Sequence, residues 1–182
     1  MDNYNVNKDD IFMEKIVSRR KTGQDYLKIA GVLVLALIVM ILISMFGGYV
    51  GFLMPLLIVG VGYGLYILIS GMNIEYEYIV TNGDLDIDQI IARRKRKRVF
   101  SGKAKELELM AKVGSDEWRD AQKQPGRKLL DCSSAIGADG NWFILAEYKG
   151  QRLTVVFAPD ERMLKSMKRY NPSKIKYVQY GA

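Results

Sequence analysis

The sequence predicts an α+β membrane protein, in which a two-helix transmembrane hairpin is followed by a mostly antiparallel β domain with a C-terminal helix. Residues 29–74 contain no Lys, Arg, Asp or Glu, whereas about 20 apolar residues are enough to cross the hydrocarbon core of a bilayer. After this run the pattern changes to short alternating segments separated by turn residues, which is typical of antiparallel strands.

Residues 1–28 precede the apolar run and are predicted to form a cytoplasmic amphipathic segment. Ile11, Phe12 and Ile16 fall at helical spacing, and Asn7 is a candidate N-cap, so we expect a helix within the first 25 residues. Such a helix could lie on lipid headgroups or pack on the domain that follows, and the pattern favours neither. The late start and the length of the apolar run argue against a cleaved signal peptide.

The apolar region, residues 29–72, is predicted to form two membrane spans at 29–46 and 49–72, joined by a turn at Gly47-Gly48. In lipid, a segment without polar side chains satisfies its backbone hydrogen bonds only as a helix. Gly60 and Gly64 stand at GxxxG spacing in the second span. They predict close helix packing, either within the hairpin or with a second copy of the chain.

The charges that flank the spans predict the orientation in the membrane. Lys and Arg residues precede the first span and follow the second, while the predicted connection between the spans carries neither. Lys and Arg collect on the cytoplasmic side of membrane proteins. We therefore expect a multi-pass protein of the cell membrane with two spans and with both termini in the cytoplasm.

Residues 73–182 are predicted to form a cytoplasmic domain of about seven strands. Glu75 and Glu77 alternate with Tyr76 and Tyr78, and the turn at Asn82-Gly83 leads to a partner strand. The expected strands are 73–81, 84–91, 95–101, 105–113, 128–134, 141–148 and 151–158, the last two joined across Lys149-Gly150. A helix should follow, opened by Pro159, favoured by Asp160 and Glu161 at its N-terminus and ended by Pro172. Its predicted apolar stripe consists of Met163, Leu164, Met167 and Tyr170.

Seven short strands followed by one amphipathic helix is the order of a pleckstrin-homology-like (PH-like) domain, in which the helix closes one end of a bent antiparallel barrel. The stretch EYEYIVTNGDLDID, residues 75–88, comes directly after the predicted hairpin. In this order the chain resembles an uncharacterised family of small bacterial membrane proteins with two transmembrane helices and a PH-like cytoplasmic domain. The resemblance covers most of the chain, and it implies no catalytic motif and no assigned activity.

A basic run gives the chain most of its net charge of +7. Its residues are Arg93, Arg94, Lys95, Arg96, Lys97, Arg98, Lys103 and Lys105, with no acid among them. Two interpretations stay open: the run pairs with Asp84, Asp86 and Asp88 across the sheet, or it contacts anionic lipid headgroups. Nucleic acid is not expected as a partner, because no recognised nucleic-acid-binding motif accompanies the run.

The composition argues against an enzyme. The chain has no histidine and one cysteine, Cys132, which excludes Ser-His-Asp and Cys-His nucleophiles and leaves an unusual ligand set for zinc. We predict no catalytic residues, no metal ligands and no cofactor, and we expect Trp118 and Trp142 to be core or interface aromatics.

The predicted function is therefore that of a membrane-anchored, non-enzymatic binding module. Its expected partners are the lipid bilayer, anionic lipids, an unidentified protein and a second copy of the chain. The alternative is a small accessory subunit of a membrane transport or channel assembly. Such a subunit would use polar groups at membrane depth, and the spans offer Ser44, Tyr63, Tyr66 and Ser70.

Overall fold

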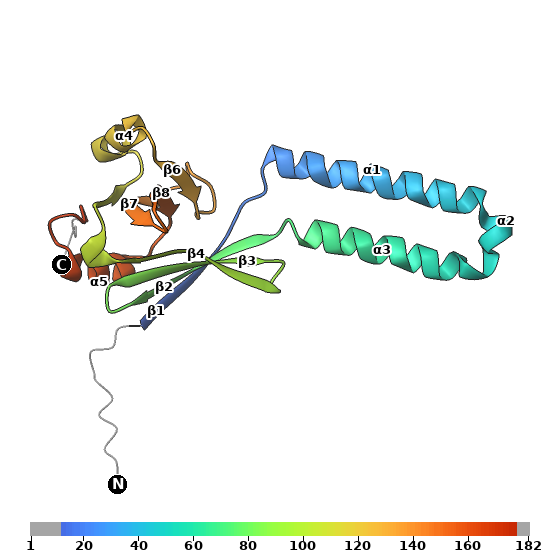
Figure 1. Ribbon diagram of the computed structural model, residues 1–182, viewed down its shortest axis with the longest axis horizontal. Helices are drawn as coiled ribbons and strands as arrows, with labels where there is room; N and C mark the ends of the chain where they lie inside the picture. The colour runs from blue at the N-terminus through green and yellow to red at the C-terminus, as the bar shows by residue number, and fades with distance from the viewer. Residues whose placement is uncertain (1–11, 178–182) are drawn as a thin grey trace, which may run out of the picture. The chain divides into compact units, whose positions relative to one another are not determined.

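The computed structural model describes residues 12–177 and divides into two compact units (Figure 1). One unit consists of residues 20–74 together with 91–95 and holds the apolar helices. The other contains nearly all of the β-structure and the C-terminal helix.

The helical unit is a hairpin of α1 (Gly23–Met45) and α3 (Met54–Ser70), which lie side by side (Figure 1). The helical segments Gly23–Met45 and Gly51–Ser70 have mean hydropathies of 2.8 and 2.2 in their most apolar windows, and none of those windows is buried inside the structure. At 1.5 Å per residue, each is long enough to cross a hydrocarbon core of about 30 Å.

The first helix begins before the apolar run, because two residues cap it. The backbone N–H and the hydroxyl of Thr22 both donate to Oδ2 of Asp25, at 2.9 and 3.0 Å. A side chain that bonds back to the N-cap in this way satisfies groups that the first turn leaves unpaired. The helix therefore starts at Gly23 rather than at Ile29.

The predicted turn at Gly47-Gly48 is wrong in its conformation. These glycines belong to a short helix, α2 (Gly47–Val50), followed by a 3₁₀-helix, η1 (Gly51–Leu53). The chain bends at Phe46, whose carbonyl accepts a hydrogen bond from Tyr49 N–H at 3.0 Å. Pro55 then lies in the first turn of α3, where its missing N–H leaves no hydrogen bond unmade.

The first sheet contains four strands in the order β1-β2-β3-β4. Their bounds are Phe12–Ser18, Ile74–Thr81, Asp84–Ile91 and Lys95–Lys103. The helix predicted near the N-terminus is wrong, because Phe12–Ser18 forms a strand antiparallel to β2, with Lys15 opposite Tyr78. Its burial alternates residue by residue, so the spacing of Phe12 and Ile16 reflects one face of a strand. Asn7 and Ile11 lie outside the described residues.

The second sheet has the order β5-β7-β8-β6. It consists of β5 (Leu109–Lys112), β6 (Lys128–Asp131), β7 (Trp142–Tyr148) and β8 (Gln151–Phe157). The strand predicted over 105–113 is reduced to β5 by the 3₁₀-helix η2 (Ala104–Glu106). The strand predicted over 128–134 ends at Asp131. The structure thus describes eight strands, and the one that the sequence did not predict is β1.

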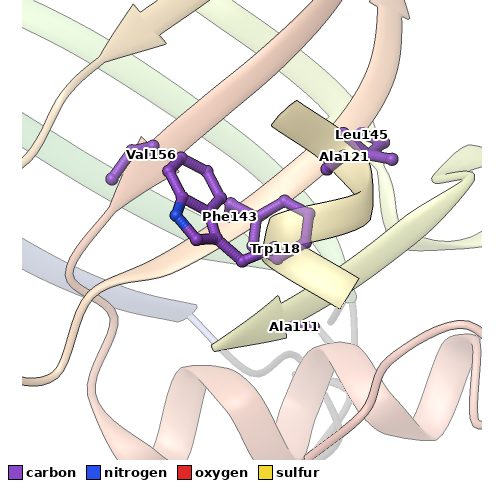
Figure 2. Packing of buried hydrophobic residues seen from close by; sticks show 6 residues of the cluster. All are labelled: Ala111, Trp118, Ala121, Phe143, Leu145 and Val156. Atoms are coloured by element: carbon purple, nitrogen blue, oxygen red, sulfur yellow. The ribbon is translucent and has the colours of Figure 1, made fainter. Parts of the chain in front are cut away.

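A short helix, α4 (Asp116–Lys123), forms in the polar stretch between β5 and β6. Ser115 caps it by accepting a hydrogen bond from Trp118 N–H at 3.3 Å. Trp118 packs against Phe143 of β7 with ring centroids 5.1 Å apart, next to Val156 of β8 (Figure 2). Trp118 and Trp142, which were expected to be core or interface aromatics, are both buried in the core.

The predicted C-terminal helix forms as α5 (Glu161–Tyr170), but it begins two residues after Pro159, which was expected to open it. Asp160 caps it by accepting a hydrogen bond from Met163 N–H at 2.8 Å. Three members of its apolar stripe, Met163, Leu164 and Met167, are buried, while Tyr170 is partly exposed. The two sheets are linked through Tyr78, whose hydroxyl donates to the carbonyl oxygen of Cys132 at 2.6 Å.

Candidate functional site: a basic strand and its groove

The arginines of β4 are paired with carboxylates of β2 and β3 in the same sheet. Arg96 donates to Oε1 of Glu77 at 2.8 Å, and Arg98 donates to Asp88 and to Asp86, each at 2.6 Å. Glu77 and Asp88 are buried. The hydrogen bond that Arg98 donates to the Asp88 carboxylate is the main cause that raises the pKa of Arg98. The positive charges of these two arginines are therefore largely balanced within the sheet.

Asp84, the third predicted carboxylate partner, is exposed at the start of β3. It makes no ion pair with the basic run among the described residues. Charge pairing across this sheet thus involves Asp86, Asp88 and Glu77, and Glu77 was not among the predicted partners.

The turn between β3 and β4 contacts the end of the second apolar helix, within the helical unit. Ala92 and Arg93 take up positive φ angles of 53° and 55° in this turn. Arg94 Nη2 donates to Ser70 Oγ at 2.7 Å, and its guanidinium carbon lies 5.5 Å from the ring centroid of Tyr66. A hydrogen bond and a cation–π contact therefore join the first part of the basic run to the end of α3.

The lysines of β4 differ from its arginines. Lys95 and Lys97 are exposed, and neither makes an ion pair with a described residue. Because successive side chains of a strand alternate between the two faces, both stand on the face opposite Arg96 and Arg98. Their charges remain uncompensated.

Lys97 lines a groove of about 270 Å³ between β4 and the β6, β7 and β8 region. The lining residues are Lys97, Arg98, Val99, Lys128, Leu130, Tyr148, Lys149, Gln151 and Leu153. They include no Asp or Glu. Lys149 Nζ lies 5.0 Å from the ring centroid of Tyr148. The groove combines positive charge with an apolar floor, and we call it the β4–β6 groove.

Lys128 and Lys149 were missed by reasoning from sequence. Lys128 reaches the groove because β6 pairs in parallel with β8, so that Lys128 lies opposite Leu153, and no periodic pattern predicts such a pairing. Lys149 was predicted only as part of a hairpin turn, which the structure confirms with a φ of 51° at this residue. The hairpin signal could have drawn attention to Lys149, but no local signal marks Lys128.

Lys103 and Lys105 are separate from this groove. They line a second pocket together with Asn82, Gly83, Asp84, Ala104, Glu106 and Tyr170. Lys103 pairs with Glu106 at 3.6 Å, and Lys105 Nζ lies 5.9 Å from the ring centroid of Tyr170. The predicted basic residues therefore occupy three environments: the turn at the end of α3, the strand β4, and this pocket.

The glycines of α3 are not in tight contact with the described residues. Gly64 lines an apolar groove between α1 and α3. A Cβ at Gly60 or Gly64 would nevertheless meet no neighbouring side chain or remote backbone atom within 4 Å. The hairpin as described does not require glycine at these positions, and packing against a second copy stays a prediction.

Glu77 of β2 and Cys132, the residue that follows β6, are buried titratable groups. Burial raises the pKa of the Glu77 carboxyl, the adjacent Glu14 carboxyl raises it further, and Arg96 lowers it. Oε2 of Glu77 is buried and makes no hydrogen bond with the residues that the structure describes. Burial also raises the pKa of the Cys132 thiol to about 12, which makes this thiol unreactive near neutral pH.

Among residues 12–177, no cluster of three or more His, Cys, Asp or Glu side chains is arranged to hold a metal ion.

Comparison with known proteins agrees with this architecture. No curated protein and no solved structure matches the chain. A family model described as the bacterial PH-like domain (DUF6106) matches residues 9–177. The match includes β1, the two apolar helices, both sheets and α5, so the fold class and the resemblance predicted from sequence are confirmed. The chain belongs to the bacterial PH-like domain family (DUF6106).

Proposed function

We propose that this protein is a membrane-anchored binding module without catalytic activity, whose PH-like domain lies in the cytoplasm and contacts anionic lipid headgroups. The observation that carries the proposal is that Lys95 and Lys97 are exposed on β4 and make no ion pair within residues 12–177, while the neighbouring arginines are paired with carboxylates. Charge pairing and lipid contact are thus divided between alternate residues of one strand.

The two apolar helices support anchoring in a membrane. Each is long and apolar enough to span a bilayer, and the connection between them carries no Lys or Arg. Under the positive-inside rule, both chain termini and the PH-like domain lie on the cytoplasmic side. That leaflet carries a negative surface potential.

The position of the basic run supports a contact with headgroups. Arg94 is bonded to Ser70 at the end of α3, where a membrane-spanning helix would leave the hydrocarbon core. Tyr66, which lies beneath the Arg94 guanidinium, is of a residue type that gathers at the interface. Lys95 follows directly, and each Lys or Arg near an anionic leaflet gains about 1 kcal/mol.

A role in binding rather than catalysis is supported by the available side chains. The chain has no histidine, and the thiol of its one cysteine is buried with a raised pKa. General-base and nucleophilic chemistry would have to rely on other groups. A protein partner of the PH-like domain is compatible with the same surface.

The proposal can be tested by measuring how fast the lysines are acetylated in the full-length protein, reconstituted in nanodiscs and read by mass spectrometry. We expect Lys95 and Lys97 to react several-fold more slowly in phosphatidylglycerol than in phosphatidylcholine nanodiscs. The difference should shrink as salt rises, because the Debye length falls to about 8 Å near physiological ionic strength.

Lys112 serves as the internal control, because it is exposed at the end of β5. Its acetylation rate should be the same in both lipids. Equal rates for Lys95 and Lys97 in the two lipids would rule out the headgroup contact and leave a protein partner as the function of the domain.

A further inference from the structure

We propose that the β4–β6 groove is a binding site for a phosphate group carried on a small organic molecule. This inference rests on the proposed function, because it extends the same basic strand. It goes further by naming the chemical group that is bound and by adding two residues, Lys128 and Lys149, to the site.

The charge of the groove favours a phosphate. Three lysines reach it from three different segments: Lys97 from β4, Lys128 from β6 and Lys149 from the turn between β7 and β8. None of the three makes an ion pair with a described residue, and the lining has no carboxylate. A concave surface lined by one sign of charge concentrates counter-ions. A phosphate monoester carries a charge of about −1.5 to −2 at pH 7 and offers several strong acceptor oxygens.

Arg98 contributes to the same wall in a different manner. Its guanidinium is already held by Asp86 and Asp88, so its charge is shared and its position is fixed. The three lysines therefore supply the free charge.

The size and the floor of the groove indicate what the phosphate is attached to. A volume of about 270 Å³ is near the lower limit of small-molecule pockets, which begin at roughly 300 Å³. Val99, Leu130 and Leu153 supply apolar surface, and the Gln151 amide supplies a neutral polar group. This lining suits a phosphate with a short organic substituent, such as a glycerol unit.

The groove is supported by packed neighbours. Tyr148, in its wall, packs against the buried ring of Phe100 with centroids 5.7 Å apart. The β6 side is fixed by the parallel register with β8, in which Leu130 lies opposite Val155. A site held by packed neighbours loses little freedom when a ligand binds.

The phosphate could belong to a lipid headgroup or to a soluble molecule, since both present the same chemistry. Two probes separate these sources. Full-length protein in phosphatidylcholine nanodiscs is titrated with glycerol 3-phosphate. In parallel, protein is placed in nanodiscs that contain phosphatidic acid, whose headgroup is a phosphate monoester. Acetylation rates of Lys97, Lys128 and Lys149 report occupancy in both experiments, and calorimetry gives the affinity for glycerol 3-phosphate.

The variant Lys128→Gln with Lys149→Gln should weaken binding by about tenfold or more for each lysine lost, because a hydrogen bond to a charged group contributes that much. The matched control is Lys112→Gln with Lys174→Gln, which removes the same charge. Both control lysines are exposed; Lys112 is on β5, at the opposite edge of the sheet from β6, and the carbonyl of Lys174 bonds to Met110 of β5. The control should bind like the wild type.

Protection of the three lysines by glycerol 3-phosphate would assign the site to soluble organic phosphates, and protection by phosphatidic acid alone would assign it to the headgroup. Absence of protection with both probes in the wild-type protein would overturn the proposal. So would an equal loss of binding in the control variant, which would indicate non-specific charge attraction. If Lys95 is shielded by anionic nanodiscs while neither nanodiscs nor glycerol 3-phosphate protect Lys128 and Lys149, the groove proposal fails and the proposed function stands. If neither probe protects any of these lysines, both fail.

Discussion

Neighbouring residues of β4 have different environments because a strand alternates its side chains. Both Lys97 and Arg98 line the β4–β6 groove, but Arg98 makes hydrogen bonds with two carboxylates, while Lys97 has no carboxylate partner among the described residues. The choice of residue types fits these positions. The planar guanidinium binds carboxylates through several fixed donors, whereas the flexible ammonium of lysine adapts to a mobile ligand.

Glu77 is the residue at which we expect a measurable effect of pH. Its pKa is raised by burial and by Glu14, and lowered less by Arg96. The folded protein therefore binds this proton more tightly than the unfolded chain does, where the pKa has its ordinary value of 4.5. The stability gained from this tighter proton binding is fully present below the ordinary pKa of 4.5. It is lost as the pH rises through the raised pKa of Glu77 in the folded protein.

The test is the variant Glu77→Gln, which resembles the protonated form. We expect it to be more stable than the wild type at pH 8, with the difference shrinking towards pH 5. Melting temperatures of both proteins across this range give the comparison. The quantity to compare is the difference in melting temperature between variant and wild type at each pH. The pKa values of Glu117 and Glu161 are lowered, so these groups make both proteins less stable as the pH falls, and the difference removes their contribution. A variant that is less stable at every pH would show that the ion pair with Arg96 outweighs the burial of the charge.

At the scale of elements, the sequence predicted those parts of the fold that depend on local signals. Asn82-Gly83 was predicted as a hairpin turn, and both residues have positive φ angles, 52° and 85°. The helix α5 was predicted from the acidic residues at its N-terminus and its apolar stripe, and three of the four stripe residues are buried. The apolar helices were evident from composition alone.

The elements that were missed depend on pairing between distant residues. β1 forms a strand because β2, more than fifty residues further along the chain, offers it an edge, and the spacing of Phe12 and Ile16 also fits a helix. β6 pairs in parallel with β8, which places Lys128 at the candidate site. Neither pairing leaves a periodic signal in the sequence.

The pairing of β1 leads to a prediction about the PH-like domain in isolation. A fragment of residues 71–182 lacks β1 and therefore exposes the edge of β2. It also loses the hydrogen bond from Lys15 Nζ to the carbonyl oxygen of Ala158, at 2.7 Å. We expect it to be less stable, by about 2 kcal/mol or more, than a chain in which residues 12–19 are joined to residue 73 by a Gly-Ser linker, since Met13 and Val17 are partly buried.

Urea unfolding followed by the fluorescence of Trp118 and Trp142, which are both buried, measures this difference. The linked chain with Lys15→Gln and Met13→Ser should fall between the two, because it keeps the strand but loses part of its packing. Equal unfolding midpoints for the fragment and the linked chain would mean that β1 adds no stability to the domain.

At the scale of the whole molecule, the family model covers both the apolar helices and the β domain, which local patterns in the sequence treat as separate parts. It extends from residue 9 to residue 177, so the apolar helices stand between β1 and β2 of one PH-like domain. The sequence predicted a hairpin followed by a domain, whereas the first strand of the sheet precedes the hairpin. The hairpin is thus an insertion in the order of the strands.

This order requires β1 and β2 to lie on the same side of the membrane, because they pair with each other. If α1 and α3 span the bilayer, the connection around Gly48 lies on the opposite side from both sheets. The flanking Lys and Arg predict that the sheets lie in the cytoplasm. The topology proposed from charge therefore agrees with a requirement of strand pairing, which is independent of charge.

Labelling of single cysteines by a membrane-impermeant maleimide tests this topology in the full-length protein. The native Cys132 should stay unlabelled, because it is buried and its pKa is raised to about 12. Gly48→Cys, at an exposed position with no neighbouring atom within 4 Å of a Cβ, should be labelled in intact cells. Lys112→Cys on β5 should react only after the cells are permeabilised, and reporters fused at residues 1 and 182 should both indicate the cytoplasm. Labelling of Lys112→Cys in intact cells would place the PH-like domain outside and would exclude contact with the cytoplasmic leaflet.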